Sequence, residues 1–462
     1  MKILIRHGEI ITATDRYTGD IYIEGGKIRA IGENLKGLFS VDREIDAGGL
    51  YVFPGGIDAH THMDMPFMGT CSSDDFETGT AAGLAGGTTA IIDFAIQTQG
   101  HTMTEAYNQW MERAQGKAVG DFAFHMAVTD FNAKTLPEVA ELMQKGVTSF
   151  KTFTAYKGAL MLDDRMLFGL MQEVQKRGGL VTVHAENGDM IDDLVQAAIK
   201  NGQTAPRYHY LTRPAIAEAE AGSRVMDLAH QSQCPLYIVH TTCRDALERV
   251  KRNYLRDQRI YVETCSQYLL LDDSLYEKPG FEGAKWVMSP PLRKKDDQEA
   301  LWASLAAGHI HTVATDHCPF NFNTQKQAGK ETFTKIPNGA PGVQHRVELL
   351  FSEGVLKNRL TLNRFVEVIA TAPAKIFGLF PRKGTIAVGT DADIVLFDPK
   401  AKHTISAKTH KHRVDYSAYE GWDVTGKVVT VLKGGNVAYE NGKLDVTKGQ
   451  GQYLTRQAFH HI

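Results

Sequence analysis

The sequence predicts an α/β protein in which a (β/α)8 barrel, similar to a TIM barrel, carries a small β-sandwich domain built from both chain ends. Between about residue 53 and about residue 375, apolar runs typical of strands alternate with segments of helical periodicity, such as 167–174 and the stretch beginning at 215. Eight alternations over about 300 residues match the size and rhythm of a (β/α)8 barrel. A doubly wound parallel sheet is the alternative.

Short strands separated by polar turns precede and follow this region. Residues 2–48 predict strands at 3–5, 10–11, 20–23 and 27–31, with a hairpin turn at Gly25-Gly26. A second set is predicted at 392–397, 403–405 and 428–432, with a turn at Gly434-Gly435. Neither set is large enough to bury a core alone, so the two are expected to pair. The predicted division is 1–52 and 376–442 for the sandwich, 53–375 for a metal-dependent barrel and 443–462 for a C-terminal tail.

The tail is polar and rich in Gly and Gln. Such a segment buries little apolar surface, so we expect it to need a partner surface to become ordered. A contact between subunits of an oligomer is the expected role.

Composition narrows the class of protein. The 462 residues carry a net charge of −3 with both signs interspersed, which gives no basic stripe for nucleic acid and no patch for a membrane surface. No signal-peptide core or apolar run of transmembrane length is evident, so a cytoplasmic protein is expected. The five cysteines form no Cys-x-x-Cys pair, which argues against a zinc knuckle or a disulfide framework.

The predicted barrel strands end near residues with metal-binding side chains. His60 and His62 lie at i and i+2 of the first strand, so both rings face the same side. In a (β/α)8 barrel the active site collects at the C-terminal ends of the strands. Each histidine alone is also compatible with a hydrogen-bonded strand end, and Asp316 with a helix N-cap. Together they favour a site for two divalent ions, zinc being well suited, with the candidate ligands His60, His62, Lys151, His184, His240 and Asp316.

Lys151 is unusual in this set. An ammonium group about 4 Å from a cation meets a repulsion of about 4 kcal/mol per unit charge even at an effective dielectric constant near 20. A neutral amine that reacts with carbon dioxide becomes a carbamate, an anionic ligand able to bridge two ions. Lys151 is therefore predicted to be N6-carboxylysine. The alternative is an ordinary lysine whose ammonium extends to solvent.

Several motifs together resemble the cyclic amidohydrolases of the amidohydrolase superfamily, most closely the dihydropyrimidinase or D-hydantoinase group. The resemblance covers essentially the whole chain. It rests on the segments 54–62 (PGGIDAHTH), 149–157 (SFKTFTAYK), 184–187 (HAEN), 235–240 (PLYIVH), 335–339 (KIPNG) and 389–395 (GTDADIV).

This resemblance implies a binuclear zinc hydrolase. His60, His62 and Asp316 would bind one zinc and His184 and His240 the other, with carboxylated Lys151 bridging them. It also implies a Tyr156 hydroxyl that stabilises the oxyanion, backbone groups near Ser289 and Asn338 that hold the substrate, and a homotetramer. Hydroxide from a metal-bridging water would attack the ring amide carbonyl while Asp316 handles the proton. Dihydrouracil, dihydrothymine and hydantoins would open to N-carbamoyl amino acids.

Two segments depart from the family pattern. Ser266 stands where many relatives have proline, and Gln344-His345-Arg346 replaces a commonly more acidic stretch. Neither contains a proposed ligand, so they bear on substrate preference more than on the reaction.

Other members of the superfamily remain as alternatives. Non-enzymatic scaffold proteins lack the metal ligands, which are all present here. Dihydroorotase carries an arginine two residues after the second metal histidine, whereas this chain has Asp64, which disfavours a substrate carboxylate. Allantoinase remains open, as do enantioselectivity and the physiological substrate. An apolar gate around the substituent of the ring is expected from Met65, Phe67, Phe153 and Leu160.

Overall fold

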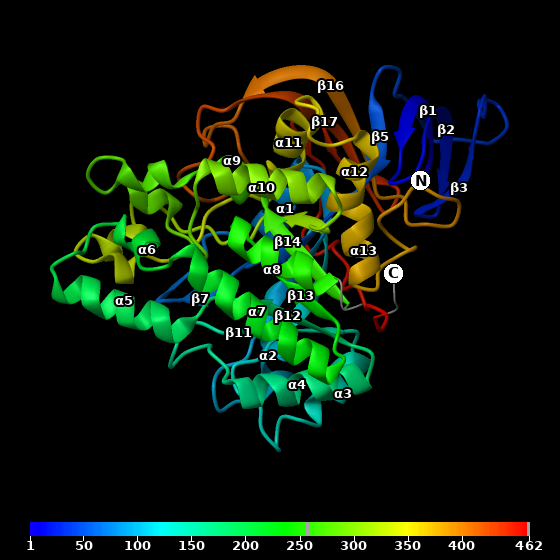
Figure 1. Ribbon diagram of the computed structural model, residues 1–462. Helices are drawn as coiled ribbons and strands as arrows, with labels where there is room; N and C mark the ends of the chain where they lie inside the picture. Colours follow the sequence, from blue (N-terminus) through cyan, green and yellow to red (C-terminus); the bar gives the residue numbers. More distant parts are fainter. Residues whose placement is uncertain (255–258, 460–462) are drawn as a thin grey trace.

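The computed structural model describes residues 1–254 and 259–459 and contains a nearly closed barrel of eight parallel strands (Figure 1). The predicted fold class is confirmed. Neighbouring strands follow the order β15-β14-β13-β12-β11-β10-β9-β6. In chain order the strands are β6 (Gly56–Thr61), β9 (Thr88–Ile96), β10 (Asp121–Ala127), β11 (Ser149–Phe153), β12 (Leu180–His184), β13 (Leu236–Ile238), β14 (Ile260–Cys265) and β15 (Thr312–Ala314).

The first and last strands approach each other where the barrel closes. The amide of His62 donates to the carbonyl of His317 at 2.8 Å, and the amide of His317 donates to the carbonyl of His60 at 3.3 Å. These bonds join the end of β6 to the residues that follow β15. Closure therefore brings side chains from the two ends of the strand series to the same rim.

Helices surround the barrel strands in Figure 1. The segments predicted to be helical at 167–174 and from 215 lie in α4 and α7. Several helices begin at polar caps: Asp163 caps α4 and Asn187 caps α5, each accepting an amide hydrogen bond. The α-helices are α1 (Phe76–Ala85), α2 (Met103–Ala114), α3 (Glu138–Gln144), α4 (Asp164–Lys176), α5 (Gly188–Lys200), α6 (Tyr208–Leu211), α7 (Ala215–Ser232), α8 (Arg244–Tyr254), α9 (Ser266–Leu270), α10 (Lys295–Ala306), α11 (Arg346–Leu350), α12 (Leu362–Val366) and α13 (Ala372–Ile376).

Shorter turns of helix complete this part of the chain. Two π-helical turns extend α11 and connect α12 to α13, and four 3-10 turns lie in the loops above the barrel. The 3-10 turns are η1 (Asp273–Glu277), η2 (Glu282–Trp286), η3 (Lys326–Gly329) and η4 (Phe333–Lys335). The π-helical turns are η5 (Phe351–Val355) and η6 (Glu367–Thr371). No helix among the described residues is both long and apolar enough to cross a membrane.

A separate nine-stranded sheet joins the two ends of the chain, as predicted. Strand β5 pairs with β1 on one side and with β16 on the other, so residues more than 340 positions apart become neighbours, for example Phe53 and Val395. The strands are β1 (Lys2–Ile11), β2 (Arg16–Glu24), β3 (Lys27–Gly32), β4 (Arg43–Asp46), β5 (Tyr51–Pro54), β16 (Ile394–Thr404), β17 (Asp423–Lys433), β18 (Asn436–Glu440) and β19 (Lys443–Leu444). A small hairpin, β7 (Pro66–Phe67) and β8 (Thr70–Cys71), lies apart from both sheets.

The two predicted Gly-Gly turns lie against each other. All four glycines have positive φ, between 54° and 76°, which side chains rarely adopt. A Cβ added to Gly435 would lie 3.0 Å from the Cα of Gly26. Glycine is therefore required here both by backbone conformation and by the contact that joins the two chain ends.

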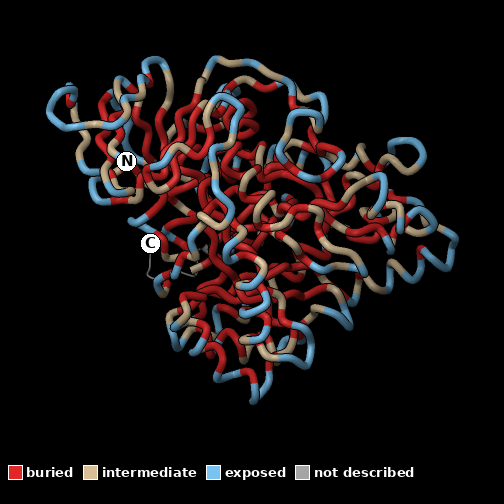
Figure 2. Tube along the Cα trace, turned by 180° about the vertical axis from the view of Figure 1, so that it is seen from behind, coloured by how far each residue is buried: buried red, intermediate tan, exposed pale blue. Residues whose placement is uncertain are grey.

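The C-terminal segment packs on its own chain, which corrects the expectation that it needs a partner to become ordered. The Phe122 amide donates to the Gln452 carbonyl at 3.0 Å, and the Leu454 amide donates to the Phe122 carbonyl at 2.7 Å. Leu454 is fully buried, and the buried Arg456 donates to the Ser149 hydroxyl at 2.8 Å. The segment covers the start of β10, and buried residues fill the interior beside it (Figure 2). Single apolar residues such as Leu454 are buried, although the average composition of the segment is polar.

Leu454→Ala is expected to destabilise the fold by about 2–5 kcal/mol, because it removes a fully buried side chain and leaves a cavity. The midpoint of denaturant unfolding measures the loss. Thr455→Ala changes an exposed neighbour and is the control. Equal midpoints for the two variants would mean that the tail does not contribute to folding.

Candidate functional site

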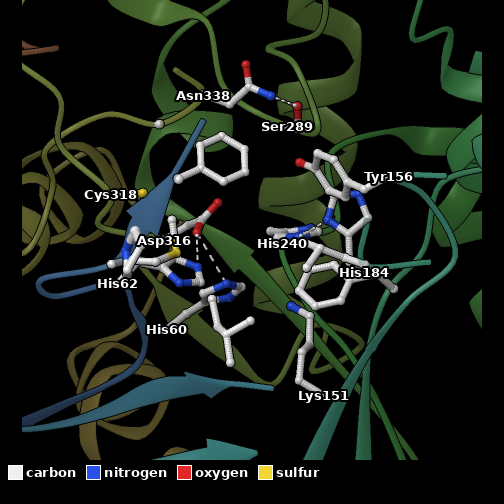
Figure 3. A pocket seen from close by; sticks show the side chains of 17 residues that line it. His60, His62, Lys151, Tyr156, His184, His240, Ser289, Asp316, Cys318 and Asn338 are labelled. Atoms are coloured by element: carbon white, nitrogen blue, oxygen red, sulfur yellow. Dashed lines mark hydrogen bonds and ion pairs between the residues drawn. The ribbon is translucent and has the colours of Figure 1, made fainter. Parts of the chain in front are cut away.

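The predicted site residues meet in one cavity at the C-terminal ends of the barrel strands (Figure 3). The cavity together with its open mouth has an empty volume of about 670 Å³. Its wall contains all nine residues proposed from the sequence, namely His60, His62, Lys151, Tyr156, His184, His240, Ser289, Asp316 and Asn338. None of these residues lies elsewhere.

His60 and His62 face Asp316. Their Nε2 atoms each lie 3.2 Å from Oδ1 of Asp316. His60 also lies 2.7 Å through Nδ1 from the buried carboxylate of Glu263. Because a carboxylate accepts, Nδ1 carries the proton of the neutral ring and Nε2 offers its lone pair to the cavity. This orientation is the one that a metal ligand requires.

His184 and His240 form a second pair across the cavity. Nδ1 of His184 lies 2.9 Å from Nε2 of His240. The other nitrogen of His184 donates to Glu186 at 2.7 Å, and Arg213 donates to the same carboxylate at 2.9 Å. Burial favours the neutral form of Glu186, but Arg213 and His184 outweigh it and lower its pKa to about 2. The charged carboxylate therefore fixes the tautomer of His184.

Lys151 lies on β11 and is 1% exposed. Burial lowers the pKa of its ammonium to about 8, so a neutral amine is far more accessible than for an ordinary lysine. Nζ lies 4.7 Å from the ring centre of Phe94 and 5.1 Å from that of Phe153. Among the described residues no carboxylate lies within salt-bridge distance of Nζ. The amine is thus buried at the site without an anionic partner.

Burial also sets the protonation state of the histidines. It lowers the pKa of His60 and of His240 well below the ordinary value, so both rings are neutral at neutral pH. Neutral imidazole is the form that binds a metal ion.

Tyr156 follows β11 with a left-handed backbone, φ 65°. His240 and Asp316 share this feature, with φ of 38° and 50°. Such conformations cost free energy in non-glycine residues and are concentrated at functional sites. Burial raises the pKa of Tyr156 to about 12, so its hydroxyl stays protonated and can donate a hydrogen bond.

A neutral polar edge lies opposite the histidines. Asn338 donates through Nδ2 to the hydroxyl of Ser289 at 3.1 Å, and both residues line the cavity. The four residues of the predicted apolar gate line it as well, namely Met65, Phe67, Phe153 and Leu160. The cavity therefore combines an apolar wall with neutral hydrogen-bonding groups.

Asp64 does not line this cavity, which corrects the expectation that it repels a substrate carboxylate directly. Its carboxylate pairs with Arg113 at 3.1 Å. The backbone turns at Asp64, where φ is 51°, and this turn directs the side chain away from the site. The position of Asp64, two residues after His62, does not by itself determine where its side chain points.

Two buried carboxylates that contact the candidate ligands were not assigned roles from the sequence. Glu263 accepts from the amide of His240 at 2.9 Å and from the hydroxyl of Tyr237 at 2.8 Å, in addition to its contact with His60. Glu186 orients His184 as described above. Both lie inside strand-end motifs, and a buried acid beside a candidate ligand is the signal that would have found them.

The donor set suits divalent metal ions. One nitrogen or oxygen from each of His60, His240 and Asp316 lies within 4.8 Å of the others. Nδ1 of His62 and Nδ1 of His240 are buried and have no hydrogen-bond partner within residues 1–254 and 259–459. Imidazoles with a carboxylate are ordinary ligands of zinc and similar ions. The residues therefore fit a metal centre.

Comparison with known proteins gives a consistent assignment. Residues 51–438 match the model of the amidohydrolase family. The chain is 48% identical to a D-hydantoinase of Geobacillus stearothermophilus, covering 99% of this chain and 97% of the relative. It is 42% identical to a dihydropyrimidinase of Rattus norvegicus, covering 99% and 89%. The crystal structure of a dihydropyrimidinase from Brevibacillus agri NCHU1002 superposes with a TM-score of 0.98 at 48% identity, covering all of both chains.

The barrel and its rim of histidines, with an aspartate and a buried lysine, define a barrel hydrolase with a candidate metal centre. The chain belongs to the amidohydrolase family, as the sequence motifs predicted. It is similar to D-hydantoinases and dihydropyrimidinases over nearly its full length.

Proposed function

We propose that this enzyme opens the rings of dihydropyrimidines and hydantoins with two divalent ions, zinc being the best fit. The observation that carries the proposal is the convergence of six candidate ligands from five strands on one cavity. His60, His62 and Asp316 would hold one ion and His184 with His240 the other. Lys151, as a carbamate, would bridge them.

When bound, divalent ions held by these residues would supply a hydroxide nucleophile at neutral pH and polarise the ring carbonyl. Asp316 accepts the proton of the attacking water, because its Oδ1 faces the centre of the site, and returns it to the leaving nitrogen. The Tyr156 hydroxyl donates a hydrogen bond to the oxyanion. The product is an N-carbamoyl amino acid.

The rest of the cavity supports a neutral ring as substrate. Ser289 and Asn338 supply neutral donors and acceptors for the imide edge, with backbone groups beside them. Met65, Phe67 and Leu160 surround the position of a ring substituent. The similarity to D-hydantoinases supports the same substrate class. The family resemblance also implies a homotetramer, which sedimentation of the purified enzyme tests.

Turnover of dihydrouracil, hydantoin, allantoin and dihydroorotate on one metal-loaded preparation tests the substrate class. Ring opening of dihydrouracil and hydantoin is the expected result. Preference for allantoin would mean that the substrate is a different ureide. Inactivity towards all four compounds with both ions bound would contradict the proposal.

Dihydroorotate is expected to have a kcat/KM at least about 100-fold below that of dihydrouracil. Its carboxylate would lose water beside Met65, Phe67 and Leu160 without gaining a paired cation, which costs several kcal/mol. Each 1.4 kcal/mol lowers kcat/KM about tenfold. The nearby Arg213 is already paired with Glu186. Equal constants for the two substrates would mean that a cation such as Arg213 reaches the ring carboxylate.

A further inference from the structure

A second group of histidines lies outside the catalytic cavity. It contains His345, at the start of α11, and His410 and His412, in the segment between β16 and β17. One ring nitrogen from each of the three lies within 4.8 Å of the others. None of them lines the cavity described above. The proposed reaction gives these three side chains no role.

His345 is buried without a polar partner. His345 is 6% exposed, and neither of its ring nitrogens has a hydrogen bond to any residue that the structure describes. An imidazole buried in this way loses its contacts with water and gains none in return, which costs free energy. Burial lowers the pKa of His345 to about 3, so the ring is neutral and keeps a lone pair. A buried polar group without a partner calls for an explanation, and a bound ion is one.

His410 has an unprotonated ring nitrogen that could bind a metal ion. Its Nε2 lies 3.0 Å from the carbonyl of Val414, which only accepts, so the proton of the neutral ring is on Nε2. Nδ1 of His410 therefore carries a lone pair, which accepts the Nδ1 proton of His412, because Nε2 of His412 accepts from the Gln344 amide. This atom faces Nδ1 of His412 at 3.3 Å. A tetrahedral zinc ion with bonds of about 2.0–2.1 Å holds two ligand nitrogens about 3.3–3.4 Å apart.

We propose that His345, His410 and His412 form a separate site for one divalent transition-metal ion of the zinc class. Three neutral imidazoles suit zinc, nickel and copper, whereas magnesium and calcium prefer oxygen ligands. Coordination by Nδ1 of His412 moves its ring proton to Nε2 and breaks the long bond of 3.3 Å from the Gln344 amide. His410 is half-buried, so solvent can reach the site and supply a fourth ligand.

The segment that carries the ligands is already held in place. The Lys411 amide donates to the side chain of Gln344 at 2.6 Å, and the Arg413 amide donates to Asp74 at 2.8 Å. An ion bound here would fasten the connection between β16 and β17 to the start of α11. The next residue, Arg346, donates to the carbonyls of Ile57 and Val313 in β6 and β15. The site thus connects the terminal sheet to the strands that carry catalytic ligands.

The number of Zn²⁺ ions bound per chain tests the proposal. Metal-free enzyme is saturated with Zn²⁺, separated from free metal and analysed by mass spectrometry. Wild-type chains are expected to retain one ion more than His345→Gln and His412→Met chains. His101→Gln replaces an exposed histidine that is distant in the sequence from the three proposed ligands. This variant is expected to bind as many ions as wild type. The difference of one ion does not depend on how many ions the catalytic cavity holds.

Ring opening by the two variants, with the catalytic ions restored, is expected to stay within about twofold of wild type, because neither residue lines the cavity. If a buried variant does not fold, His410→Gln replaces it, since that ring is only half-buried. Equal metal content in wild type and in the folded variants would overturn the proposal.

Discussion

Lys151→Ala is expected to lower kcat/KM by about three orders of magnitude or more and to reduce the number of tightly bound ions. The side chain is the ligand proposed to bridge both halves of the site, and it lies on β11 between the two histidine pairs (Figure 3). Two ions that share a bridging anion contribute several kcal/mol of charge stabilisation, and each 1.4 kcal/mol is tenfold in rate. Turnover of hydantoin and metal content measured on the same samples test this.

Lys176→Ala is the matched control for that experiment. Lys176 ends α4, the helix that follows β11, and its side chain is 69% exposed. Its removal is expected to leave both turnover and metal content unchanged. A Lys151→Ala enzyme that kept two ions and normal turnover would show that the carbamate assignment is wrong. Recovery of activity with an added small carboxylic acid would support it, because the acid would replace the bridging oxygens.

Asp316→Asn is expected to lower kcat by about 10²–10⁴-fold with little change in KM. The amide keeps an oxygen that can contact an ion, but it cannot accept the proton of the attacking water. A group that acts only in the transition state changes kcat and kcat/KM together. Steady-state kinetics of hydantoin opening test this, with metal content measured in parallel to show that the ions remain bound.

A loss confined to KM in Asp316→Asn would move the general base elsewhere. His317, the next candidate from the sequence, is poorly placed for that role. Its Nε2 pairs with Asp74 at 3.1 Å, and its Nδ1 accepts from the Gly342 amide at 3.0 Å. Both nitrogens are engaged outside the cavity.

The sequence by itself determined the barrel and the candidate ligands. Strand and helix periodicity are local properties, and a parallel barrel places every strand end on one rim, so His60, Lys151 and Asp316 were predicted to meet without any knowledge of packing. The Gly-Gly turns were equally local, since only glycine adopts positive φ without cost. The family motifs then connected these positions to a reaction.

Only the tertiary structure decided the direction of individual side chains and the contacts between distant segments. Asp64 turns towards Arg113 and away from the cavity, because its backbone conformation and its ion pair depend on neighbours outside the motif. Leu454 is buried against β10 although its segment is polar on average. Glu263 reaches His60 from a strand 203 positions away. His345 meets His412 only when the terminal sheet packs against the barrel, and no local pattern encodes a contact between elements that far apart.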